Sequence, residues 1–259
     1  MSRLLSFIFA CMFVPVFLQG QTFPLQNRNL YWFEEPAKSA KYALPLGSQQ
    51  LTALVYGAPG TEQIRLKSAD DQCVGTLRLT SLGHEMYSNY RHTLDLDSAM
   101  DIVEYMVPSQ PGVTGEQTYY KFRRETFCPM GDSLLVMRLT TDSPKGLSFA
   151  VQLTSDSDSQ NSSFQKLDTY LKVTNRGGQQ MERDGALYVT DQQEAILYLD
   201  MSRVKDVKSQ ALSRVEGLDY QALLSGHVSQ YRSIADSSTL WLGEDPKAHR
   251  PVNVHRSKA

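Results

Sequence analysis

The sequence predicts a mainly β protein: a large antiparallel β-sandwich (a super-sandwich) with a short C-terminal helical segment. Three observations predict this fold. Apolar and polar residues alternate from Leu51 to Met201, turn residues interrupt the alternation at short intervals, and helical periodicity begins only after it. A parallel α/β sheet would need a helix between successive strands. About ten or more strands are expected, too many for an immunoglobulin-sized module, so we expect two large sheets.

Two segments show the strand pattern most clearly. From Leu147 to Leu153 every second residue is apolar, which is typical of a strand with one buried face. Ser133–Thr140 is more continuously apolar, which indicates a deeply buried strand. Asp142–Gly146 contains proline and glycine, so the two strands are predicted to form a β-hairpin. Similar strands are expected at Leu51–Tyr56, Gln63–Leu66, Thr76–Thr80, Tyr90–Leu96, Asp101–Val107, Thr118–Phe127, Leu167–Thr174, Ala186–Thr190 and Ala195–Leu199.

Helical periodicity follows the last of these strands. A shorter helical stretch, Val204–Val215, precedes a longer one in which apolar residues recur at three- and four-residue spacing over residues 220–231. Asp219 can cap the start of the longer helix. His227 lies on its apolar stripe, so we expect a hydrogen-bonded packing histidine instead of a catalytic one. Thr239–Leu242 is expected to form one last strand.

The N-terminus has the features of a signal peptide. Arg3 supplies a positive charge, Leu4–Val14 is an apolar run, and a small residue, Gly20, precedes the expected cleavage before Gln21. The apolar run is too short for a transmembrane helix. We therefore expect a secreted or periplasmic protein without membrane attachment after cleavage. The predicted segments are the signal peptide (1–20), the β-sandwich (21–203), a helical linker with a final strand (204–243) and a polar tail (244–259).

Composition excludes several partners and cofactors. The net charge of −2 and the isoelectric point of about 6.2 argue against nucleic acid as a partner, because nucleic-acid-binding domains are usually basic. The mean hydropathy of −0.36 argues against a polytopic membrane protein. The histidines lack the spacing of a zinc site, and phosphate-binding loops are missing, so neither a metal nor another cofactor is predicted. These histidines are His84, His92, His227, His249 and His255.

No catalytic residue is predicted. A glycosidase needs two carboxylates that flank the scissile bond. Glu34 and Glu35 are adjacent, so on a strand they would face opposite ways. Asp95 and Asp97 would share a strand face, and an exposed face explains both of them without catalysis.

Three aromatic residues are candidates for carbohydrate binding. Trp32, Tyr119 and Tyr120 could stack on the apolar faces of sugar rings. Core packing is the competing interpretation for all three. The sequence therefore leaves a glycan-binding role open.

The mature chain would keep two cysteines, Cys73 and Cys128. In an exported protein they could form a disulfide, and closing so long a loop would stabilise the fold by a few kcal/mol. They could equally be two buried thiols.

Several segments resemble glycoside hydrolase family 95, the inverting α-L-fucosidases and related α-galactosidases. Leu30–Ala37 and Ala43–Gly47 are similar to the opening of that family. Tyr90–Ala99 resembles its Tyr-Arg-Arg-x-Leu-Asp-Leu-Asp-x-Ala segment. The later segments that follow the family in order are Arg124–Phe127, Asp132–Leu139, Gly146–Leu153, His227–Tyr231 and Leu240–Gly243. Together they cover about residues 30–243.

The resemblance implies a large N-terminal β-sandwich, in agreement with the periodicity. In that family the catalytic residues lie in an (α/α)6 barrel after the sandwich, and no position of this chain corresponds to them. Two motifs also differ: the family's Gly-Asn-Gly is Gly47-Ser48-Gln49 here, and Lys67–Asp70 replaces its Asn-Glu-x-x-x-Trp. We therefore expect an N-terminal sandwich domain without autonomous hydrolase activity.

Two alternatives remain. The chain could be a stand-alone carbohydrate-binding module, whose partner would be a glycan. It could also be the sandwich half of a split α-fucosidase or α-galactosidase, whose partner would be a separately encoded catalytic barrel. A barrel reading frame just past codon 259 would distinguish the second alternative from the first.

Overall fold

The structure is a computed structural model that describes residues 29–48, 50–68, 71, 73–109, 117–130, 132–154, 170–175, 178–201, 217 and 219–238. Four predictions lie outside these residues: the signal peptide 1–20, the helical stretch Val204–Val215, the strand Thr239–Leu242 and the tail 244–259.

Within the described residues the chain forms fourteen strands, one short 3-10 helix and one α-helix. The strands are β1 (Leu30–Phe33), β2 (Leu44–Gly47), β3 (Leu51–Val55), β4 (Thr61–Ser68), β5 (Cys73–Ser81), β6 (Ser88–Asp95), β7 (Met100–Pro108), β8 (Tyr119–Phe127), β9 (Leu134–Thr141), β10 (Leu147–Thr154), β11 (Tyr170–Asn175), β12 (Gln179–Arg183), β13 (Ala186–Gln192) and β14 (Glu194–Asp200). The helices are η1 (Ala40–Tyr42) and α2 (Tyr220–Ser238).

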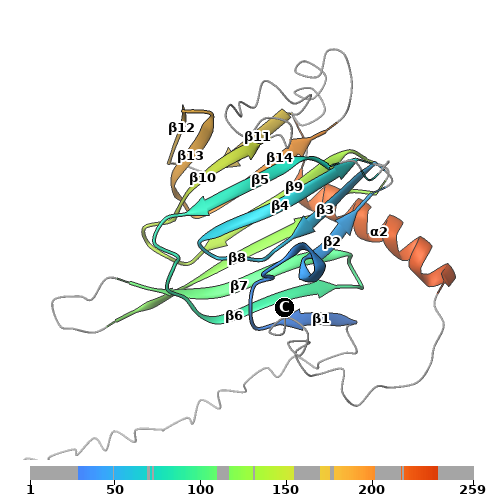
Figure 1. The fold of residues 1–259 in the computed structure, drawn as a ribbon, viewed down its shortest axis with the longest axis horizontal. Helices are drawn as coiled ribbons and strands as arrows, with labels where there is room; N and C mark the ends of the chain where they lie inside the picture. The colour runs from blue at the N-terminus through green and yellow to red at the C-terminus, as the bar shows by residue number, and fades with distance from the viewer. Residues whose placement is uncertain are drawn as a thin grey trace, which may run out of the picture.

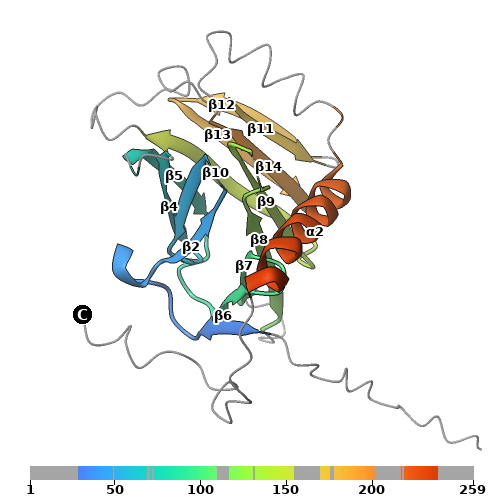
Figure 2. The ribbon, with the colours of Figure 1, turned by 90° about the vertical axis from the view of Figure 1, so that its right-hand side faces the viewer.

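The strands form two seven-stranded antiparallel sheets (Figure 1). Sheet A has the order β1-β6-β7-β8-β9-β14-β11, and sheet B has the order β12-β13-β10-β5-β4-β3-β2. Figure 2 shows them as two layers, with α2 on the side of sheet A that faces away from sheet B. The predicted antiparallel sandwich is confirmed.

Alternating apolar residues build the core between the sheets. On β10 the residues Leu147, Phe149, Val151 and Leu153 are all buried, as the alternation predicts. The facing strands of sheet A contribute alternate residues in the same way, for example Val103 and Tyr105 of β7. Because successive side chains on a strand point to opposite faces, one apolar face per strand is enough to fill this space.

The predicted hairpin between Ser133–Thr140 and Leu147–Leu153 is wrong. The two strands exist as β9 and β10, but β9 pairs with β8 and β14 in sheet A, whereas β10 pairs with β5 and β13 in sheet B. The turn Asp142–Gly146 therefore carries the chain from one sheet to the other. Turn residues fix where a strand ends, and they do not determine which strand it pairs with.

Three strands were not predicted: β1, β2 and β12. All three are edge strands, and none has the long alternation of a central strand. Every residue of β12 is exposed, so no apolar face marks it in the sequence. Its strand conformation depends on pairing with β13.

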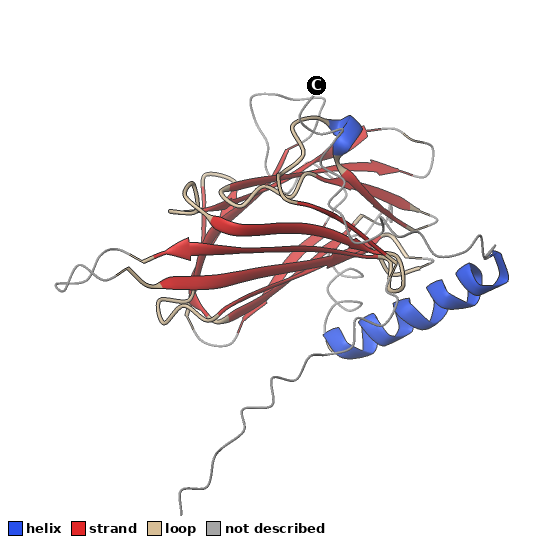
Figure 3. Ribbon diagram, turned by 90° about the horizontal axis from the view of Figure 1, so that it is seen from below, coloured by secondary structure: helices blue, strands red, loops and turns tan. Residues whose placement is uncertain are grey.

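Helix α2 covers one end of the outer face of sheet A (Figure 3). Asp219 Oδ2 accepts a hydrogen bond from the Ala222 amide at 3.1 Å, which confirms the predicted cap. Tyr220 and His227 are buried against Phe127, with ring centroids 5.9 and 5.0 Å away. His227 Nε2 also lies 3.3 Å from the Ala99 carbonyl, so it is the packing histidine that the sequence predicts.

Among the described helices, none is long and apolar enough to cross a membrane.

Candidate functional site

The three predicted carbohydrate-binding aromatics lie in different environments. Trp32 is half-buried on β1, with the Arg91 guanidinium 4.5 Å from its ring centroid. Tyr119, at the start of β8, is 45% exposed and its hydroxyl lies 3.4 Å from Gln117 Oε1. Tyr120 points to the opposite face of β8 and packs against the core. Only Tyr119 therefore presents a largely open ring.

The sheet also keeps Trp32 away from Tyr119. Three strand spacings separate β1 from β8, roughly 14 Å. Trp32 is level with Ile102 of β7, whereas Tyr119 pairs with Pro108 of the same strand. Six residues of strand add roughly 20 Å. The three aromatics do not form one binding platform.

The two aspartates that were expected on an exposed face are used locally. Asp95 is buried, and its Oδ1 accepts a hydrogen bond from the Asp97 amide at 2.9 Å. Asp97 lies in the turn after β6 and accepts from the Asn29 side chain at 3.2 Å. The prediction of a shared exposed strand face is therefore wrong. These carboxylates hold the β6–β7 turn and the start of β1.

A buried ion pair connects the two sheets. Glu62 of β4 and Arg124 of β8 are 0% and 3% exposed, and Arg124 donates to Glu62 from Nη2. Glu62 Oε1 also accepts from the amides of Tyr56 and Gln63, at 2.9 and 3.1 Å. Burial raises the pKa of the Glu62 carboxyl, and the Arg124 guanidinium opposes that rise. The pair joins the sheets and fixes the β3–β4 loop.

A second buried pair lies beside the first. His92 of β6 contacts Asp101 of β7 through Nε2, and both side chains are fully buried. Tyr90 donates its hydroxyl hydrogen to the Gly57 carbonyl at 2.7 Å. A Cβ atom on Gly57 would come within 2.3 Å of His92 Nδ1. Only glycine fits where the β3–β4 loop crosses these side chains.

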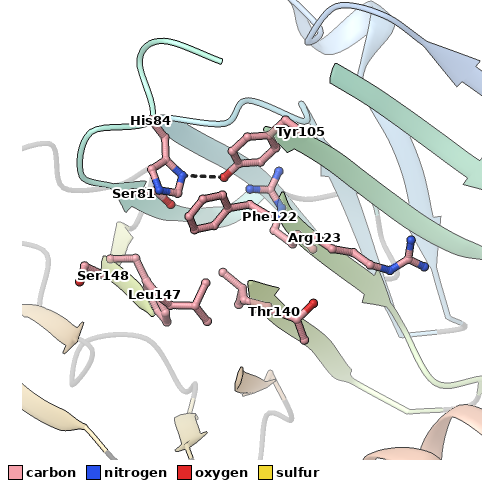
Figure 4. A pocket seen from close by; sticks show the side chains of 11 residues that line it. Ser81, His84, Tyr105, Phe122, Arg123, Thr140, Leu147 and Ser148 are labelled. Atoms are coloured by element: carbon pink, nitrogen blue, oxygen red, sulfur yellow. Dashed lines mark hydrogen bonds between the residues drawn. The ribbon is translucent and has the colours of Figure 1, made fainter. Parts of the chain in front are cut away.

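A small pocket lies between the sheets below His84 (Figure 4). His84, on the loop between β5 and β6, contacts the Tyr105 hydroxyl through Nδ1 at 2.8 Å and packs edge-on against Phe122 at 4.2 Å. Burial lowers the pKa of His84 to about 4 and raises the pKa of Tyr105 to about 12. Both groups are therefore neutral at pH 7, and the pocket has no room for a sugar, since its volume is about 10 Å³.

Acid should weaken the fold through His84. The neutral form is favoured in the folded chain, so this contribution is complete above pH 6.5 and is lost as the pH falls toward 4. We expect the free energy of unfolding of the wild type, relative to a His84→Gln variant, to fall by about 3 kcal/mol between pH 7 and pH 4. Urea unfolding at several pH values measures this difference. Parallel pH profiles for the two proteins would refute the role of His84.

Carboxylates on the outer face of sheet A form a charge ladder with arginines. Arg123 pairs with Glu104 and Glu125 at 2.7 and 2.8 Å, and Arg138 pairs with Glu125 and Glu194 at 3.2 and 2.6 Å. Adjacent strands bring these opposite charges side by side.

The described residues contain no group of three or more metal-ligating side chains.

The two cysteines are not joined by a disulfide. Cys73 is exposed at the start of β5 in sheet B, whereas Cys128 is buried just after β8 in sheet A. The alternative of two buried thiols is wrong for Cys73. Burial raises the pKa of the Cys128 thiol to about 12, so this thiol is protonated and unreactive at neutral pH.

Sequence reasoning missed Glu62, Arg124 and the role of His84. The predicted strand began at Gln63, although Glu62 is in phase with the buried Ile64 and Leu66. Extending the alternation by one residue would have placed Glu62 in the core. No comparable signal identifies its partner, because pairing across sheets depends on the three-dimensional fold.

Comparison with known proteins bears on the sandwich. Residues 65–166, from β4 to beyond β10, match the family model described as glycosyl hydrolase family 65, N-terminal domain. The match supports a glycosyl hydrolase N-terminal β-sandwich. It names family 65, so it gives no support to family 95 specifically.

The similarities to curated proteins and to solved structures are absent or weak. No curated protein matches the chain. Among the solved structures, one described as a kojibiose phosphorylase from the human microbiome is similar at 9% identity, with a TM-score of 0.47. That similarity covers 80% of this chain and 39% of the other, so the chain spans less than half the length of that protein.

Proposed function

We propose that this chain is an exported glycosyl hydrolase sandwich domain that has no hydrolase activity of its own and acts as a structural module in glycan degradation. The observation that carries the proposal is the use of its carboxylates. Glu62 and Asp101 are held in buried ion pairs. Glu104, Glu125 and Glu194 form ion pairs with arginines in the charge ladder on the outer face of sheet A. The match of residues 65–166 to an N-terminal, not a catalytic, domain agrees with this role.

The finer assignment is part of the same proposal. The segments that resemble family 95 extend the sandwich likeness on both sides of the family 65 match, and they favour a relative of the α-L-fucosidase sandwiches. Export rests on the signal-peptide features of residues 1–20. Detection of the mature chain, cleaved before Gln21, in the secreted or periplasmic fraction tests export independently of activity.

Activity assays test the central part of the proposal. The purified chain should release no nitrophenol above the buffer rate from nitrophenyl α-L-fucoside, α-galactoside or α-glucoside. Cooperative thermal unfolding of the same preparation is the control that the protein is folded. Saturable turnover that co-purifies with the folded chain would contradict the proposal.

A further inference from the structure

The pocket below His84 has the size of a single water molecule. Its volume of about 10 Å³ matches the space that one water needs. Ser81, Tyr105, Phe122 and Arg124 are among its lining residues, so it is partly polar and partly aromatic. His84, on the loop between β5 and β6, is another lining residue and contacts the Tyr105 hydroxyl (Figure 4).

Arg124 lines this pocket and has one buried donor that finds no acceptor among the described residues. Arg124 is 3% exposed, and Nη2 and Nη1 donate to Glu62 and to the Ala58 carbonyl. Its Nε–H finds no acceptor among the described residues. A buried N–H without an acceptor is unfavourable, so an acceptor in the adjoining pocket would stabilise the fold.

Two hydroxyl groups on the pocket can complete the coordination. Ser81 and Tyr105 are both buried and both line the pocket. A hydroxyl can accept as well as donate, which suits a ligand that accepts from Arg124 and donates in turn. The ligand is expected to be neutral. Glu62 already neutralises the charge of Arg124, so an anion in the pocket would lose its hydration without gaining a net positive partner.

We propose that this pocket binds one water molecule, which accepts a hydrogen bond from Arg124 Nε and donates to the hydroxyls of Ser81 and Tyr105. The water connects Ser81 of β5 with the Glu62–Arg124 pair of β4 and β8. The two sheets then share one continuous polar network. His84 shields that network from solvent, which ties the loop between β5 and β6 to the core.

Water-selective NMR on the full chain labelled with ¹⁵N-arginine tests the site in solution. The Arg124 Nε–H resonance, assigned by its loss in Arg124→Lys, should show a direct Overhauser effect at the water frequency. Ser81→Ala should abolish it. Ser148→Ala is the matched control, because that hydroxyl points away from Tyr105 (Figure 4), and the effect should persist. A folded wild type without the effect, or an unchanged effect in Ser81→Ala, would overturn the proposal.

Crystals grown with bromide in place of chloride identify the ligand. A high-resolution map should show one oxygen within hydrogen-bond distance of Arg124 Nε and no anomalous signal there. A bromide peak in the pocket, or a pocket without density, would overturn the assignment of water.

Discussion

Arg124→Leu should cost about 3–5 kcal/mol of the free energy of unfolding. The substitution leaves the Glu62 carboxyl buried without its charge partner, and breaking a buried ion pair from one side has an effect of this size. Urea unfolding of the purified chain measures it.

Arg123→Leu is the matched control, because it changes the same residue type at the next position. Arg123 is 32% exposed and pairs with Glu104 and Glu125 on the outer face of sheet A. Solvent screens these pairs, so a loss of about 1 kcal/mol or less is expected. Equal losses for the two variants would mean that burial between the sheets does not increase the contribution of the Glu62–Arg124 pair to the free energy of unfolding.

Gly57→Ala should destabilise the fold by about 2–5 kcal/mol. Gly57 has a φ of +82°, which costs an L-residue about 1–2 kcal/mol. The new methyl group would also lie 2.3 Å from His92 Nδ1 and 2.6 Å from the Tyr90 hydroxyl, and such overpacking adds about 1–3 kcal/mol. Thermal or urea unfolding provides the measurement.

Gly83→Ala separates the two causes. Gly83 has nearly the same φ, +81°, but no atom lies within 4 Å of a Cβ built there. This variant should lose only about 1–2 kcal/mol from backbone strain. A loss as large as that of Gly57→Ala would show that strain alone, and not contact with the buried His92, determines the effect.

Alternation predicts the individual strands well because each strand of a sandwich buries one face. It fails for β9 and β10, because their separate alternations say nothing of which sheet each joins. It also fails for β12, whose residues are all exposed. Strand pairing is decided by contacts between distant segments, which no local pattern records.

The candidate site was harder to predict than the fold. Trp32, Tyr119 and Tyr120 were selected by residue type, but the register of sheet A keeps Trp32 away from the other two. Glu62 and Arg124 have the composition of surface residues, and charged side chains are almost never fully buried unless paired. Only the packing of β4 against β8 brings these charges together.

The family resemblance predicted the type of domain, an N-terminal glycosyl hydrolase sandwich, but the family it named, family 95, has no support from the match. The expected N-terminal glycosyl hydrolase sandwich agrees with the match over residues 65–166, which names family 65.

We expect the buried charges of this sandwich to hold its two sheets together. A double-mutant cycle of Glu62→Gln and Arg124→Leu measures this most directly. Glutamine keeps an oxygen for the Tyr56 and Gln63 amides, so the cycle isolates the ion pair. We predict a coupling free energy of about 2 kcal/mol or more, with the double variant more stable than Arg124→Leu alone. Additive losses, with coupling near zero, would contradict the claim.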